Sequence, residues 1–247
     1  MELTLIGIGT GNPEHLTLQA IRAINAQDAV LIPRKGEGKA DLAGLRRAIC
    51  DEVLTNGATR IVEFDLPVRD ERTQDYRQRV DDWHDAIALC WQKAMAEVPG
   101  ASRVALLVWG DPSLYDSTLR IAARLDPAPQ VRVIPGITSL QALTAAHAIP
   151  INEIGAPFTV TTGRRLRAEG WPEGAETLAV MLDGGCAFES LAPEGIDIWW
   201  GAYVGMAEQI ICAGPLAEVA GRIVQMRAEA RERHGWIMDI YILRRAG

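Results

Sequence analysis

The strongest constraint on the fold is the alternation of short apolar runs with helix-like segments in the first half of the chain. Thr17 can cap a helix in which Leu18, Ile21 and Ile24 recur at helical spacing. Alternating strands and helices predict a mostly parallel sheet with right-handed crossovers. The predicted strands are residues 3–8, 29–32, 61–66, 104–109 and 131–134.

Two further helices lie between these strands. A helix through Leu45 and Ile49 is expected to end at Asn56-Gly57, a pair that favours the left-handed backbone. Thr73 is expected to open a long helix with aromatic residues along one stripe. At that spacing, the stripe is typical of a buried core rather than of a base-stacking surface.

The fourth predicted strand runs into the stretch "LVWGDPSLYDS", residues 106–116. Its apolar residues do not alternate with polar ones, so it reads as a central strand buried on both faces. Gly110 and Pro112 then stop the pairing. A turn at the carboxyl end of a parallel strand is where open α/β sheets bind ligands, although an ordinary tight turn has the same composition.

Apolar segments crowd together in the second half, which predicts a mixed or antiparallel sheet in an α+β domain. We expect an N-terminal α/β domain over 1–137 and a C-terminal domain over 138–247 that closes a cleft for ligands. The predicted strands are 158–162, 178–182, 196–204, 209–212 and 236–243, with helices near 186–192 and over 216–233.

Composition excludes several classes of protein. The net charge of −7 argues against nucleic-acid partners, which need a broad basic surface. The four cysteines and four histidines are scattered, so neither a disulfide framework nor a metal site is expected. The start "MELTLIGIG" lacks signal-peptide features, and no apolar run approaches the ~20 residues of a membrane helix. These features predict a cytoplasmic protein without membrane contact.

The loop "GIGTGNP", residues 7–13, follows the first strand and raises a nicotinamide-binding hypothesis. The glycine spacing differs from the dinucleotide fingerprint, and Pro33-Arg34 stand where an acidic residue would end the second strand. The glycines still permit a ligand to approach the backbone closely.

Two basic clusters follow strand ends: "PRKGEGK" and "TTGRRLR". They are interpreted either as solvated surface or as a site that holds a polycarboxylate by bidentate pairing. The candidate substrate-binding residues are Arg34, Lys35, Arg164 and Arg165. "VMLDGG", residues 180–185, ends another strand in an Asp-Gly turn, which alone would signal a hairpin.

Four loop motifs together resemble those of the tetrapyrrole (corrin) methyltransferases, in the same order and spacing. They are "GIGTGNPEHLTLQAI", "WGDPSLYDS", "VIPGITSLQAL" and "GAYVGMAEQIICAGPL", which together span nearly the whole chain. Asp116 stands where most of the family has a second glycine, as in an acetate-releasing subgroup.

The resemblance implies the two-domain α/β tetrapyrrole methylase architecture, with S-adenosylmethionine as methyl donor, usually in a homodimer. It also implies methylation of carbon 1 of precorrin-5 with release of acetate to give precorrin-6A, a step of aerobic cobalamin biosynthesis. A sibling that methylates a different macrocycle carbon is the alternative. Diphthine and ribosomal-RNA methyltransferases share the donor loops, but the acidic charge speaks against RNA.

Carried over by position, the resemblance assigns donor-binding residues to each motif. The implied set is Pro13, Gly110, Asp111, Leu114, Thr138, Ser139, Leu182, Ala202, Tyr203, Ala213 and Gly214. Direct methyl transfer needs neither a metal nor a covalent enzyme intermediate. Loss of the acetyl group needs an activated water, and Asp111, Tyr115 and Asp116 are the candidate catalytic residues for it.

Overall fold

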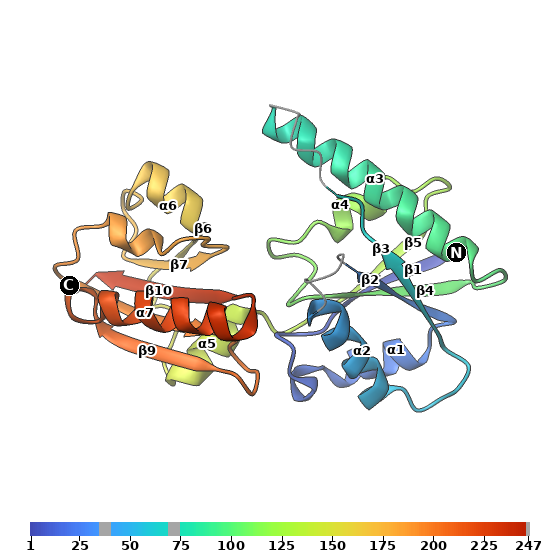
Figure 1. Ribbon diagram of the computed structural model, residues 1–247, viewed down its shortest axis with the longest axis horizontal. Helices are drawn as coiled ribbons and strands as arrows, with labels where there is room; N and C mark the ends of the chain where they lie inside the picture. The colour runs from blue at the N-terminus through green and yellow to red at the C-terminus, as the bar shows by residue number, and fades with distance from the viewer. Residues whose placement is uncertain (35–40, 69–74, 246–247) are drawn as a thin grey trace. The chain divides into compact units, whose positions relative to one another are not determined.

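The computed structural model describes residues 1–34, 41–68 and 75–245, and the chain divides into two compact units, Met1–Thr138 and Ser139–Gly247. Each unit is built around its own five-stranded sheet (Figure 1). Within the described residues, no helix is both long and apolar enough to cross a membrane.

The first unit contains a parallel sheet in the order β3-β2-β4-β1-β5. Its strands confirm the five predicted apolar runs to within a residue or two. They are β1 (Glu2–Gly7), β2 (Ala29–Arg34), β3 (Arg60–Asp65), β4 (Arg103–Val108) and β5 (Gln130–Ile134). The helices are η1 (Pro13–His15), α1 (Leu18–Asn25), α2 (Asp41–Val53), α3 (Tyr76–Ala96) and α4 (Thr118–Ala122).

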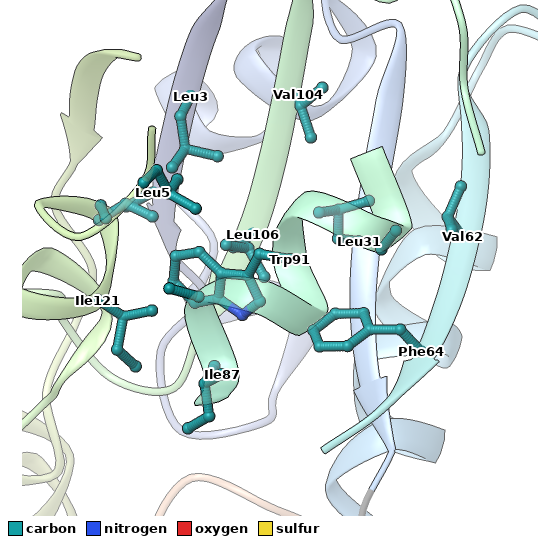
Figure 2. Close-up of a cluster of buried hydrophobic side chains, with 14 of the residues drawn as sticks. Leu3, Leu5, Leu31, Val62, Phe64, Ile87, Trp91, Val104, Leu106 and Ile121 are labelled. Atoms are coloured by element: carbon teal, nitrogen blue, oxygen red, sulfur yellow. The ribbon is translucent and has the colours of Figure 1, made fainter. Parts of the chain in front are cut away.

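Helices cover both faces of this sheet because its strands are apolar on both faces. Residues of α3 and α4 share one buried cluster with the sheet, and residues of α1 and α2 share the other. Figure 2 shows the first cluster, in which the indole of Trp91 from α3 lies among Leu31, Leu106 and Ile121. Of the aromatic stripe, Trp91 therefore belongs to the core and Trp83 packs against it, as predicted.

The second unit has the mixed sheet expected from its crowded apolar segments, in the order β6-β7-β10-β8-β9. The β6–β7 pair is parallel, and the other three pairs are antiparallel. The strands are β6 (Thr159–Thr162), β7 (Thr177–Met181), β8 (Ile196–Ala202), β9 (Ile210–Pro215) and β10 (Asp239–Arg245). The helices are α5 (Ser139–His147), α6 (Gly163–Glu169), η2 (Ala187–Ser190) and α7 (Leu216–His234).

Several local expectations were wrong. The second helix ends at Val53, and Gly57 is not left-handed, because the Asn56 side chain instead accepts the N–H groups of Ala58 and Thr59. The helix expected near 186–192 is only a short 3-10 turn. Helices α4, α5 and α6 were not foreseen, and the Asp-Gly turn leads into η2 instead of a hairpin. Thr73 lies outside the described residues, and α3 carries Asp75 as its N-cap.

Candidate functional site

The loops after β1 and β4 leave neighbouring strands and lead to opposite faces of the first sheet. The β1 loop leads to α1, and the β4 loop leads to α4, whose buried residues belong to the other cluster. Such a switch point opens a crevice at the carboxyl edge of an open α/β sheet, where ligands bind. The tight turn foreseen at residues 106–116 therefore lies where the topology favours a ligand site.

Glycines pack three loops together at this edge. Gly9 and Gly110 form a bridge in which the Gly110 N–H donates to the Gly9 carbonyl at 2.8 Å. A Cβ on Gly136 would lie 2.1 Å from the Gly110 carbonyl oxygen, so glycine is required there. Gly110 itself has φ +66°, and the nearest atom to its missing Cβ would be Thr138 Cα, at 4.0 Å. Space is therefore open beside the Gly110 backbone.

The Asp111 carboxylate ties the β4 loop to the β5 loop. One oxygen accepts the Ser113 N–H at 2.8 Å and the Ser113 hydroxyl at 2.5 Å, and the other accepts the Gly136 N–H at 2.9 Å. Partial burial opposes ionisation, but these hydrogen bonds hold the pKa of Asp111 below its ordinary value. The Asp111 side chain thus holds the β4 loop in one conformation.

The remaining first-unit candidates surround this loop. Tyr115 is 44% exposed with φ +49°, and Asp116 accepts the N–H of Thr118 at 2.6 Å as well as its hydroxyl. Asp116 therefore shapes the start of α4. Pro13 is exposed in η1, and Leu114 donates its N–H to the Asp111 carbonyl at 3.3 Å.

In the second unit, Leu182 follows β7 with φ +52° and is 64% exposed. Its neighbour Asp183 is buried and accepts hydrogen bonds from the Ala187 N–H at 2.5 Å and the Tyr241 hydroxyl at 2.7 Å. Burial alone would raise the pKa of Asp183, but the hydrogen bonds and the Arg167 charge hold it low. The Tyr241 pKa is raised by burial and by Asp183. Asp183 therefore anchors the loop that displays Leu182.

Tyr203, with φ +51°, follows β8 directly after Ala202, and its side chain is buried. Its hydroxyl donates to the Trp236 carbonyl at 2.5 Å, and its ring meets the rings of His234 and Trp236 edge to face. The side chain is thus part of the core of this unit. Ala213 and Gly214 lie in β9 opposite β8, and Ser139 opens α5.

Backbone strain coincides with three of the predicted site residues, one catalytic candidate and two donor-binding candidates. Within the described residues, five non-glycine residues have φ in the left-handed region, and Tyr115, Leu182 and Tyr203 are three of them. Such conformations cost of order 1–3 kcal/mol and cluster at ligand sites. The other two are Ala148 and Cys186.

Two of the basic candidates, Arg34 and Arg165, are already paired with carboxylates of their own unit. Arg34 bonds Asp65 at 3.1 Å, and Arg165 grips both carboxylate oxygens of Glu169. Arg164 and Arg165 lie on α6, not on the loop that the sequence suggested. Lys35 lies outside the described residues.

Sequence reasoning missed two groups of residues. Arg46 of α2 donates to the Leu107 carbonyl at 2.9 Å, and Arg227 joins Asp239 to the Asp183 carbonyl. No short sequence motif signals these contacts, because Arg46 bonds a residue 61 positions away and Arg227 bonds residues 12 and 44 positions away. In the described part of the chain, no group of three or more His, Cys, Asp or Glu residues could hold a metal ion.

Comparisons with known proteins found relatives that match nearly the whole chain. Residues 2–220 match the family model described as Tetrapyrrole (Corrin/Porphyrin) Methylases. The chain is 49% identical to "Precorrin-6A synthase [deacetylating]" of Sinorhizobium sp, over 99% of this chain and 95% of that protein. It is 30% identical to "Precorrin-2 C(20)-methyltransferase" of Sinorhizobium sp, over 72% and 71%.

Solved structures share the fold. A putative cobalamin synthesis related protein from Corynebacterium diphtheriae superposes with a TM-score of 0.83 at 38% identity, over 100% of both chains. A uroporphyrin-III C-methyltransferase from Thermus thermophilus, complexed with S-adenosyl homocysteine, gives a TM-score of 0.60 at 20% identity, over 98% and 97%. The second likeness concerns the fold alone.

Proposed function

Because the chain belongs to the tetrapyrrole (corrin/porphyrin) methylase family, we propose that it methylates carbon 1 of precorrin-5 and releases acetate to give precorrin-6A. The observation that carries this proposal is the 49% identity, over nearly the whole chain, to a deacetylating precorrin-6A synthase. The sibling C(20)-methyltransferase is only 30% identical and covers less of the chain, which makes methylation at another carbon the weaker candidate.

We propose S-adenosylmethionine as the methyl donor. The open space beside the left-handed Gly110 fits a ligand that approaches the backbone closely, and the switch point between β1 and β4 is a favoured ligand position. In the first unit the proposed donor contacts are Pro13, Gly110, Asp111, Leu114 and Thr138. In the second unit they are Ser139, Leu182, Ala202, Tyr203, Ala213 and Gly214.

The bound donor supplies a methyl group on a sulfonium, which is already a good electrophile. The main task of the chain is therefore to hold the ligands in line and to exclude water. The loop at Gly110 is suited to that task because the Gly9 bridge and the Asp111 carboxylate fix it before any ligand arrives. A preorganised loop loses little entropy on binding.

Release of acetate adds a second demand. A water oxygen must bond to the acetyl carbonyl carbon while the bond to the macrocycle breaks and its electron pair stays on the ring. Asp111, Tyr115 and Asp116 are the proposed groups for polarising the carbonyl or moving a proton. The carboxylates of Asp111 and Asp116 already accept local hydrogen bonds, whereas the Tyr115 side chain is substantially exposed. Tyr115 is therefore the first of the three to test.

The proposal is tested by incubating the protein with precorrin-5 and methyl-labelled donor, followed by mass analysis of the macrocycle and assay of acetate. We expect one labelled methyl gained and one acetyl group lost. Methyl gain without acetyl loss would assign a sibling step. In the same assay, a Tyr115→Phe variant that still methylates the macrocycle but releases acetate slowly would support a role of Tyr115 in acetate release.

We also propose that the protein acts as a cytoplasmic homodimer. The family resemblance supports the dimer, and four scattered cysteines without a disulfide framework favour a reducing compartment. Sedimentation equilibrium at micromolar concentration should give twice the chain mass of 26.9 kDa. A monomer mass at all concentrations would contradict the dimer.

A further inference from the structure

Strand β4 loses one of its neighbours just before the donor loop begins. Its pairing with β1 continues to Val108, whose carbonyl accepts the Ile8 N–H at 2.9 Å. Its pairing with β2 ends earlier, at Leu31 and Leu106. Successive carbonyls of a strand point to opposite sides, so the Leu107 carbonyl faces the side on which β2 has diverged.

Arg46 of α2 takes the place of the missing strand at this point. Its Nε donates to the Leu107 carbonyl oxygen at 2.9 Å, across 61 residues of sequence. Burial lowers the pKa of Arg46, and attraction to the nearby Asp116 carboxylate opposes that effect. The guanidinium thus bonds the end of β4, immediately before the Gly110 loop.

We propose that Arg46 is a positioning residue that fixes the end of β4 through the Leu107 carbonyl, and thereby sets the affinity of the Gly110 loop for the donor. The inference rests on the proposed function in one respect, that this loop binds the donor. Arg46 is the part of α2 that reaches the carboxyl edge of the sheet between β2 and β4. Arg46 acts on donor binding through the position of the Gly110 loop.

The fork of an arginine suits this task better than a lysine. A guanidinium carries its donors in a rigid plane and can aim one of them at a carbonyl, whereas an ammonium is a compact charge on a flexible stem. Arg46→Lys should therefore rescue only part of the function lost in Arg46→Met. The adjacent Arg47 is a matched control, because it pairs with Asp51 and Glu63.

The test is calorimetric titration of the full chain with S-adenosylhomocysteine. We expect about tenfold weaker binding for Arg46→Met, about threefold weaker binding for Arg46→Lys and no change for Arg47→Met. In the labelled-methyl assay, the KM for the donor should rise more than the KM for the tetrapyrrole.

Several outcomes would overturn the inference. Binding by Arg46→Met within twofold of wild type would do so, and so would a loss of affinity in Arg47→Met as large as that in Arg46→Met. If Arg46→Met fails to fold by circular dichroism, wild-type affinity in a folded Arg46→Lys variant overturns it instead. Absence of binding by the wild-type protein would be a different result, since it would remove the proposed donor itself.

Discussion

At the residue scale, the Asp111 carboxylate joins the loops after β4 and β5, a contact that the loop motifs alone do not reveal. Asp111 stands in the β4 loop, yet its second oxygen bonds the backbone of Gly136 after β5. The residue was expected to touch the donor or the acetyl group. Its hydrogen bonds instead show it holding two loops in register, a role that ligand contact does not preclude.

Asp111→Ala should lower the free energy of unfolding by about 1–3 kcal/mol, because it leaves the Gly136 and Ser113 N–H groups without their acceptor. The folded-state pKa of Asp111 is depressed, so its stabilisation is complete above the unfolded-state pKa of about 3.9 and is lost as the pH falls through the lower folded value.

Urea unfolding of wild type and Asp111→Ala over a series of pH values measures this effect. The difference between them should be constant near neutrality and shrink below about pH 4. Ser113→Ala, which removes the hydroxyl bond alone, should cost less. A difference that stays the same down to pH 2 would show that the carboxylate charge is not what stabilises the loop.

At the element scale, the start of α6 is packed against the buried carboxylate after β7. A Cβ on Gly163 would lie 2.3 Å from Asp183 Cγ. Asp183 in turn anchors the Leu182 loop and accepts the Tyr241 hydroxyl of β10. A single glycine therefore allows helix, loop and strand to meet at one carboxylate.

Gly163→Ala should destabilise the second unit by roughly 1–3 kcal/mol, because Asp183 must leave its hydrogen bonds to make room. Gly184→Ala is the matched control, since a Cβ there would meet no atom within 4 Å and its φ is not left-handed. Thermal unfolding should show a lower midpoint for Gly163→Ala alone. Equal midpoints for both variants would mean that Asp183 adapts at little cost.

At the scale of the whole molecule, an acidic chain is proposed to bind an acidic ligand. The net charge is −7, and the proposed substrate carries many carboxylates. The Arg34 and Arg165 candidates already pair with exposed carboxylates of their own units. Such exposed pairs contribute only about 0.2–1 kcal/mol, so a substrate carboxylate can compete with them.

Glu169→Gln should therefore tighten tetrapyrrole binding by up to about fivefold, because it removes the carboxylate that competes for Arg165. Replacing Arg164 and Arg165 together by alanine should weaken tetrapyrrole binding. The affinity for S-adenosylhomocysteine should stay unchanged both in this double variant and in Glu169→Gln. Fluorescence titration with a tetrapyrrole polycarboxylate, at low and high salt, measures these changes. Weaker binding in Glu169→Gln would show that Glu169 orders Arg165 for the substrate.

The sequence by itself determined the elements whose signals are local. Unbroken apolar runs such as 104–109 predicted the parallel strands, because a strand buried on both faces needs no polar alternation. Helical spacing predicted α1 and α7 in the same way. The position of the Gly110 turn after β4 also followed from the sequence.

Short elements escaped prediction because they depend on tertiary contacts. Helix α6 has seven residues, too few for a clear periodic signal, and its arginines were interpreted as a loop. Asn56 did not end a helix with left-handed Gly57, because its side chain could accept the backbone of Ala58 and Thr59. Local hydrogen bonds of this kind compete with the expected cap.

The tertiary structure alone decided which side chains meet. Asp111 with Gly136, Arg46 with Leu107 and Asp183 with Tyr241 join segments 25 to 61 residues apart. No periodicity encodes such a pair, because its geometry depends on the strand order β3-β2-β4-β1-β5 and on the point at which β2 leaves β4. The sequence therefore placed the loops, and only the fold decided what holds them in place.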